Sequence, residues 1–246
     1  MSLVNILHKS FKDDFFYFWE KIEKYENFTF SRYADGEVLL MNGNSVSYNT
    51  QAFSIDKWYA TDGLTKAGKQ LLETLNHKED NYYYAISSKS DNINDYNYLI
   101  NNIQQDISKI TFVNLWINSN YQLMLEKLNN LQRDVVIICN KNAKKENFPF
   151  NAIDITEFPD DCINFWESND CNFINSLIEK YSLLNNQLFF ISCGPISEII
   201  IHELYKNNPN NTYVDVGSSI DEFVHGYKTR PYMNPYSDYS KAISFF

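Results

Sequence analysis

The sequence predicts an α/β fold, a single Rossmann-like domain whose mostly parallel sheet has helices on both faces. Short apolar runs alternate with runs of helical periodicity along most of the 246 residues. Some apolar runs are continuous, as in the Val-Val-Ile-Ile stretch at 135–138, which is typical of strands buried on both faces. No Gly/Ser-rich or Pro-rich linker divides the chain, so we expect one domain over residues 1–246.

The N-terminal segment 1–27 is expected to be helical and to pack on this domain. Within it, Phe11, Phe15, Trp19 and Ile22 have helical spacing, which predicts a helix over 11–25. Strands are predicted at 28–31, 82–87, 110–115, 135–140, 152–155, 188–192 and 212–216. Helices are predicted at 64–75, 93–107, 121–131, 172–183 and 197–206. Irregular structure is expected in a polar loop at 41–54 and a tail at 227–239.

The composition argues against several classes of partner. The formal net charge of −10 argues against binding to nucleic acid, whose phosphates are bound by basic surfaces. No apolar run approaches about 20 residues, so no transmembrane segment is expected, and no signal peptide precedes the domain. The cysteines form no CxxC pair and the histidines lack metal-ligand spacing, so we expect reduced thiols and exposed or hydrogen-bonded histidines. These features favour a cytoplasmic protein, and they are compatible with an oligomer and with a place at the inner face of the membrane.

The first candidate site follows the first predicted strand. Ligands in parallel sheets bind beyond the carboxyl ends of the strands, where the run Arg32-Tyr33-Ala34-Asp35-Gly36-Glu37 lies. Asp35 and Glu37, separated by Gly36, offer the oxygen ligands that Mg²⁺ or Mn²⁺ takes. Arg32 has the fork geometry that binds phosphate. The alternative is a helix N-terminus capped by Asp35.

The second candidate site is the connection after the strand at 188–192. Ser192, Gly194 and Pro195 lead into the helix at 197–206, whose free N–H groups and partial positive charge could bind an anion. An ordinary strand-to-helix connection, with Gly in the turn and Pro at the start of the helix, explains the same residues.

The third candidate site is the end of the last predicted strand. Asp215 lies within the strand, and Asp221 follows the turn that contains Gly217 and Ser218. Either aspartate could act as a general base, a metal ligand or a partner of a sugar hydroxyl. The alternative is that Asp221 caps a helix and Asp215 bonds to backbone.

A fourth run places amides beside aromatic rings. Asn114 and Asn118 lie close in sequence to Trp116 and Tyr121, a combination that suits sugars because they present both hydroxyls and apolar C–H faces. The alternative is the end of a strand followed by a helix cap.

Taken together, these runs resemble bacterial glycosyltransferases of the GT-D fold. The resemblance rests on the run from Arg32 to Glu37, supported by Gly194-Pro195 and by the stretch at 213–218. It implies a nucleotide-sugar donor, commonly UDP-linked, with the divalent metal held by Asp35 and Glu37. It also implies hexosyl transfer to a glycan or glycoconjugate acceptor in surface polysaccharide or glycoprotein synthesis.

Two other functions remain alternatives at this level. The stretch Val214-Asp215-Val216-Gly217 looks like the strand-to-glycine turn of S-adenosylmethionine-dependent methyltransferases, although few residues follow it. The abundant aromatic and Asn residues also fit a non-catalytic sugar- or nucleotide-binding module.

Overall fold

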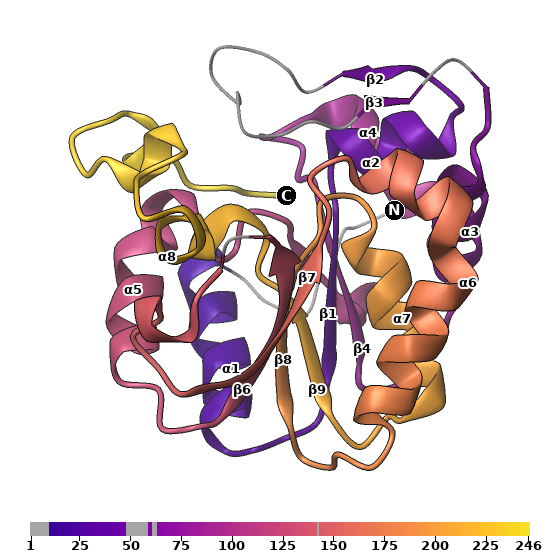
Figure 1. The fold of residues 1–246 in the computed structure, drawn as a ribbon. Helices are drawn as coiled ribbons and strands as arrows, with labels where there is room; N and C mark the ends of the chain where they lie inside the picture. Colours follow the sequence, from indigo (N-terminus) through magenta and orange to yellow (C-terminus); the bar gives the residue numbers. More distant parts are fainter. Residues whose placement is uncertain (1–9, 48–58, 61–62, 142) are drawn as a thin grey trace.

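The structure, a computed structural model, describes residues 10–47, 59–60, 63–141 and 143–246. The main strands are β1 (Thr29–Tyr33), β4 (Tyr82–Ile86), β5 (Ile110–Phe112), β6 (Val135–Asn140), β7 (Ala152–Phe158), β8 (Leu188–Ser192) and β9 (Thr212–Asp215). They form one seven-stranded sheet in the order β5-β4-β1-β9-β8-β6-β7, and every neighbouring pair is parallel (Figure 1). Two short strands, β2 (Val46–Ser47) and β3 (Tyr59–Ala60), pair antiparallel beside it.

Helices cover both faces of the sheet. One face carries α1 (Phe11–Glu23) and α5 (Tyr121–Asn129), and α8 (Asp221–His225) packs at its end. The other carries α2 (Asp35–Met41), α3 (Lys66–Thr74), α4 (Ile93–Asn102), α6 (Cys162–Tyr181) and α7 (Ser197–Asn207). Along β6, Val135 and Ile137 join the first core and Val136 and Ile138 the second, because successive strand residues point to opposite faces. The predicted α/β class with a parallel sheet is confirmed.

The N-terminal helix α1 packs on the sheet through an aromatic face. Ser10 begins it by accepting a hydrogen bond from Asp13 N at 3.1 Å. Phe15 and Phe18 are fully buried, and the Phe18 ring lies 5.0 Å from the ring of Phe30 on β1. Trp116 belongs to the same core at 1% exposure, so its ring is not available to a sugar.

Several predicted boundaries are wrong, each for a local reason. The helix predicted at 172–183 begins ten residues earlier, at Cys162, because Ile163 and Trp166 are buried in the core and stabilise these first turns. The helix predicted at 93–107 ends at Asn102, since Ile103 is extended. The strand predicted at 110–115 ends at Phe112, where a turn begins with Leu115 N donating to Phe112 O.

Other segments add structure that the sequence did not predict. The helix α2 occupies 35–41, and β2 lies within the predicted loop at 41–54, of which residues 48–54 fall outside the described residues. The tail at 227–239 is irregular except for short 3-10 turns, as at Pro231–Met233. The expectation for the histidines is wrong for His202, which is 9% exposed and whose Nδ1 has no hydrogen-bond partner among the described residues.

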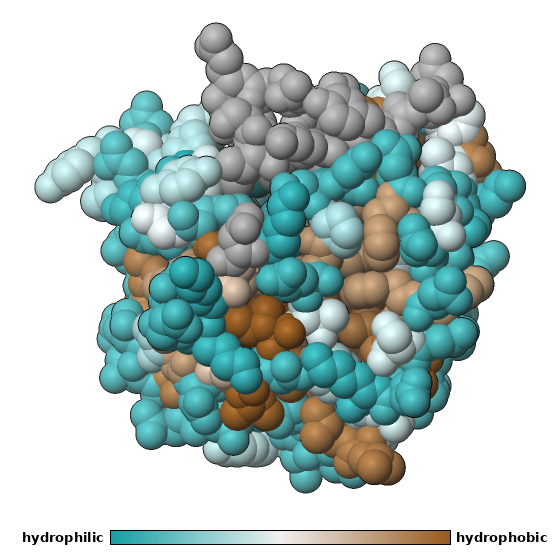
Figure 2. All heavy atoms as spheres, viewed as in Figure 1, coloured by the Kyte–Doolittle hydropathy of each residue, from teal (hydrophilic) through white to brown (hydrophobic). Residues whose placement is uncertain are grey.

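The face shown in Figure 2 is mostly hydrophilic, with apolar residues gathered at its centre and in its lower part. Among the described residues, no helix is both long and apolar enough to cross a membrane. The four cysteines form no disulfide within the described residues, and three of them, Cys139, Cys162 and Cys193, are buried.

Candidate functional site

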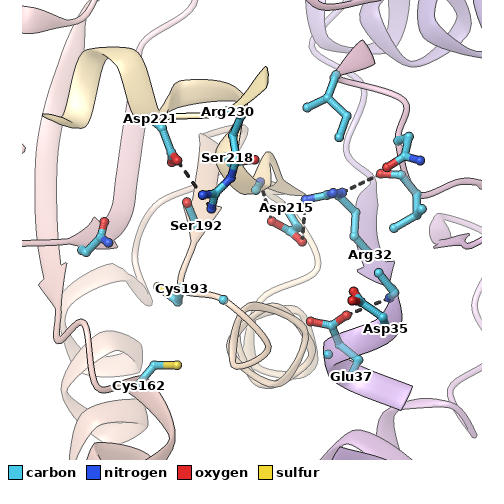
Figure 3. Close-up of a pocket in the computed structure, with 18 of the residues that line it drawn as sticks. Arg32, Asp35, Glu37, Cys162, Ser192, Cys193, Asp215, Ser218, Asp221 and Arg230 are labelled. Carbon is cyan, nitrogen blue, oxygen red and sulfur yellow. Dashed lines mark hydrogen bonds and ion pairs between the residues drawn. The ribbon is translucent and has the colours of Figure 1, made fainter. Parts of the chain in front are cut away.

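A cavity of about 460 Å³ opens at the carboxyl ends of β1, β6, β8 and β9. This is the place expected for a ligand, because the chain runs outward from β1 through β4 to β5 and later returns inward through β8 to β9. Most of the predicted site residues line the cavity, namely Arg32, Asp35, Gly36, Glu37, Asn114, Ser192, Gly194, Asp215, Gly217, Ser218 and Asp221 (Figure 3).

Two predicted residues do not line it. Asn118 lies in the 3-10 turn Asn118–Asn120 with a φ of 56°, and the neighbouring Ile117 reaches the cavity instead. Pro195 lies within the connection from β8 to α7 and is buried. Tyr121, suggested as a sugar platform, is fully buried.

Arg32 is held by backbone and carboxylate at the end of β1. Its Nε donates to Val113 O at 2.7 Å, and its Nη1 lies 3.5 Å from Asp215 Oδ2. Gly217 gives the guanidinium its room, because a Cβ at this position would stand 1.8 Å from Arg32 Nη1. Gly217 also has a φ of 48°, a conformation that residues with a Cβ rarely adopt. Only glycine therefore fits beside Arg32.

Asp215 ends β9 inside this arrangement. Its Oδ1 accepts a hydrogen bond from Gly217 N at 2.7 Å, and its residue is 5% exposed. Burial raises the pKa of Asp215, and the charge of Arg32 opposes that effect. Behind it lies Glu198 of α7, fully buried, whose Oε1 accepts from Arg32 N at 3.3 Å. Burial and the charge of Asp215 raise the pKa of Glu198 well above its usual value.

Asp35 and Glu37 open the helix α2. Glu37 Oε2 accepts a hydrogen bond from Ala34 N at 2.7 Å, so Glu37 completes the N-terminus of the helix. Asp35 is its first residue and is exposed. The helix alternative is therefore correct, but Glu37 is the capping residue where the sequence suggested Asp35. Burial raises the pKa of Glu37 to about 7, and the charges of Asp35 and Asp215 add to that rise.

The carboxylates fit a metal ion whose coordination another ligand completes. Within the described part of the chain, no group of three or more His, Cys, Asp or Glu side chains is arranged to hold a metal. Asp35 and Glu37 offer oxygen ligands whose mutual repulsion a cation would relieve. Mg²⁺ commonly binds through one or two carboxylates together with water and substrate phosphates, which matches this pair.

The connection after β8 is a capped turn. Cys193 N donates to Ser197 Oγ at 2.8 Å, and Gly194 has a φ of 57°. Both Ser192 and Gly194 face the cavity, so the ordinary-connection alternative and a contact with ligand are compatible.

Sequence reasoning missed Arg230. The residue lines the cavity from the C-terminal segment, and its Nη2 lies 3.8 Å from Asp221 Oδ2. Asp221 Oδ2 also accepts from Thr229 Oγ1 at 2.7 Å. The only available signal was an arginine beside a proline in an aromatic tail, which by itself carries no functional information. Glu198 was also missed, because its contact with Arg32 joins residues 166 positions apart.

Comparison with known proteins gives a fold. No family model matches the chain, and no curated protein does either. Among solved structures, one described as domain of unknown function 1792 with a distinct glycosyltransferase fold matches at a TM-score of 0.58. It is 17% identical and the match covers 88% of this chain and 82% of that one. The chain has a glycosyltransferase fold. A selenomethionine structure of the same domain matches equally, at a TM-score of 0.58 and 16% identity. The predicted resemblance is confirmed for the fold.

Proposed function

We propose that this protein is a metal-dependent glycosyltransferase that moves a sugar from a nucleoside diphosphate, UDP in the first instance, to a glycan or glycoconjugate. The observation that carries the proposal is the cavity at the carboxyl ends of β1 and β9, in a glycosyltransferase fold. Five carboxyl side chains line it, those of Asp35, Glu37, Asp160, Asp215 and Asp221, against two guanidiniums, Arg32 and Arg230. Because this excess of acid repels a diphosphate, the proposed donor requires a cation beside Arg32.

The chain's own residues suit the chemistry of a diphosphate leaving group. A bound metal would neutralise negative charge on that group as the glycosyl bond breaks. Arg32 lines the same cavity and is held in place by Val113 O and Asp215. Preorganised charge of this kind favours a transition state in which negative charge develops.

Asp215 is the better placed of the two predicted bases. A raised pKa makes its carboxylate a stronger proton acceptor than an ordinary aspartate, and it lines the cavity beside Arg32. Both aspartates accept a hydrogen bond and pair with an arginine, Asp221 with Thr229 and Arg230 and Asp215 with Gly217 and Arg32, so the choice of Asp215 rests on its raised pKa. We therefore propose Asp215 as the base that receives the proton of the acceptor hydroxyl.

The test is a screen of nucleotide sugars and S-adenosylmethionine for thermal stabilisation with Mn²⁺, followed by assays of donor hydrolysis. Stabilisation by UDP-sugars that depends on Mn²⁺, with turnover, is the expected result. UDP binding without turnover would indicate a binding module, and stabilisation by S-adenosylmethionine alone would indicate a methyltransferase.

Two variants then examine the metal ligands. Asp35→Asn and Glu37→Gln should each weaken Mn²⁺-dependent UDP binding at least about tenfold, since a metal–carboxylate contact is lost. Gln at 37 can still accept from Ala34 N, so the helix start is preserved. Glu203→Gln, which removes an exposed ion pair with Lys206, is the matched control. Unchanged Mn²⁺ dependence in both cavity variants would exclude this metal site.

A further inference from the structure

The C-terminal segment forms a wall of the cavity. Arg230, Pro231, Tyr232 and Tyr239 all line it, although they follow the last strand of the sheet. In Figure 1 this segment lies beside α8, at the end of the sheet where the cavity opens. The wall therefore comes from a part of the chain that belongs to neither the sheet nor its covering helices.

Buried neighbours hold Arg230 in that wall. Tyr232 is 5% exposed and Met233 fully buried, and Tyr232 OH lies 2.8 Å from Ser218 Oγ in the turn after β9. The ring of Tyr232 also packs edge-on against that of Tyr121, with centroids 5.0 Å apart. On the other side of Arg230, Thr229 donates to Asp221. Anchors on both sides of the residue make its position part of the folded structure.

Each of the two arginines of the cavity pairs with an aspartate. Arg32 pairs with Asp215 and Arg230 with Asp221, and both aspartates come from the stretch that ends β9 and begins α8. Their side chains are 15% and 11% exposed, so each guanidinium is largely shielded from water while it faces the cavity. Figure 3 shows Arg32 and Arg230 among the residues that line the cavity.

We infer that Arg230 binds the diphosphate of the donor together with Arg32, with Asp221 as the residue that positions it. This inference rests on the proposed function. A diphosphate has two phosphoryl groups, and the planar guanidinium fork matches one of them with two hydrogen bonds. Shielding from water strengthens such charge-assisted contacts. The role also explains why Asp221, which lines the cavity, accepts from Thr229 and pairs with Arg230.

The experiment compares Arg230→Gln, Arg230→Lys and the control Lys228→Gln, an exposed cation two residues away. UDP and inorganic pyrophosphate binding with Mn²⁺ is measured by titration calorimetry, and uridine binding by saturation-transfer NMR. Arg230→Gln should weaken UDP and pyrophosphate about 10–100-fold, the usual effect of losing a charged hydrogen-bond partner, with uridine unchanged. Arg230→Lys should retain part of the affinity because the charge remains without the fork. Lys228→Gln should match the unmodified protein.

The outcomes distinguish a failure of the role of Arg230 from a failure of the proposed function. If the unmodified protein binds neither UDP nor pyrophosphate, the proposed function fails and the inference fails with it. If it binds both and Arg230→Gln binds them equally well, only the role of Arg230 is overturned. If both Arg230 variants lose affinity for uridine as much as for UDP, Arg230 only supports the wall of the cavity. That result would also overturn the inference.

Discussion

An arginine lies at each end of the sheet, and the two have different surroundings. At the carboxyl end, Arg32 pairs with Asp215 and faces a cavity. At the amino end, Arg133 is 3% exposed and donates to the carbonyl oxygens of Ile22 and Asn186 and to Thr212 Oγ1. Within the described chain it has no carboxylate partner, and burial lowers its pKa to about 10.

The difference distinguishes an arginine that stabilises the fold, Arg133, from one that is placed to bind a ligand, Arg32. Arg133 joins the end of α1 to the loop before β8 and to the first residue of β9, so its hydrogen bonds hold three segments together. Arg32 is held by Val113 O and Asp215, but it also lines the cavity. Changes at the carboxyl end should therefore alter ligand binding and turnover, and changes at the amino end should alter stability.

The largest effect is expected at Gly217, beside Arg32. Gly217→Ala places a Cβ where Arg32 Nη1 now lies, so we expect turnover to fall about 100-fold or more as the guanidinium is displaced. The control is Gly226→Ala, because Gly226 also has a positive φ, 77°, but no atom lies within 4 Å of the added Cβ. Transfer rates and urea unfolding of both variants measure the two effects. Equal turnover in the two would show that Gly217 acts only through backbone conformation.

A smaller effect, on stability alone, is expected at the amino end. Arg133→Met should lower the free energy of unfolding by about 2 kcal/mol, because buried acceptors lose their donor. The exposed pair of Lys127 and Glu23 offers a contrast, and Lys127→Met should cost at most about 1 kcal/mol. Denaturant unfolding measures both, and UDP affinity should stay unchanged. A change in UDP affinity for Arg133→Met would contradict the division between the ends.

The smallest effect concerns pH and lies among the aromatic rings near His202. Burial, with the charges of His77 and Lys206, lowers the pKa of His202 to about 4. Below its usual value of 6.5 the unfolded chain takes up a proton that the folded chain does not. The contribution of His202 to the free energy of unfolding is therefore fully present above pH 6.5, and it is lost as the pH drops towards 4.

Urea unfolding at pH 7.5 and 5.0 checks this, with an expected loss of about 1–2 kcal/mol from His202. His202→Gln should make the loss smaller. An unchanged loss in this variant would assign the acid sensitivity to other groups, among them His77, whose pKa burial also lowers.

The sequence predicted some elements to the residue. The bounds of β6 and β8 agree with the prediction, because a continuous apolar run between polar residues can only be a buried strand in this context. The start of helix α6 was predicted ten residues too late. Its first turns contain Glu167, Ser168 and Asn169, and packing of Trp166 and its neighbours stabilises them as helix.

The sequence predicted the site residues at the strand ends but missed Glu198 on α7 and Arg230 in the C-terminal segment. The rule that parallel strands present ligands at their carboxyl ends was enough to select Arg32, Asp35 and Asp215. It could not select Glu198, which reaches Arg32 only because α7 packs beside β1. Asn118 was selected, but the turn after β5 carries it away from the cavity.

By itself, then, the sequence determined the fold class, most strands and the polar strand ends, because hydrophobic periodicity and turn residues are local properties. Tertiary structure alone decided that Gly217 makes room for Arg32 and that the C-terminal segment brings Arg230 to the same cavity. These contacts join residues far apart in the chain, and they exist only where packing of the two cores brings those segments together.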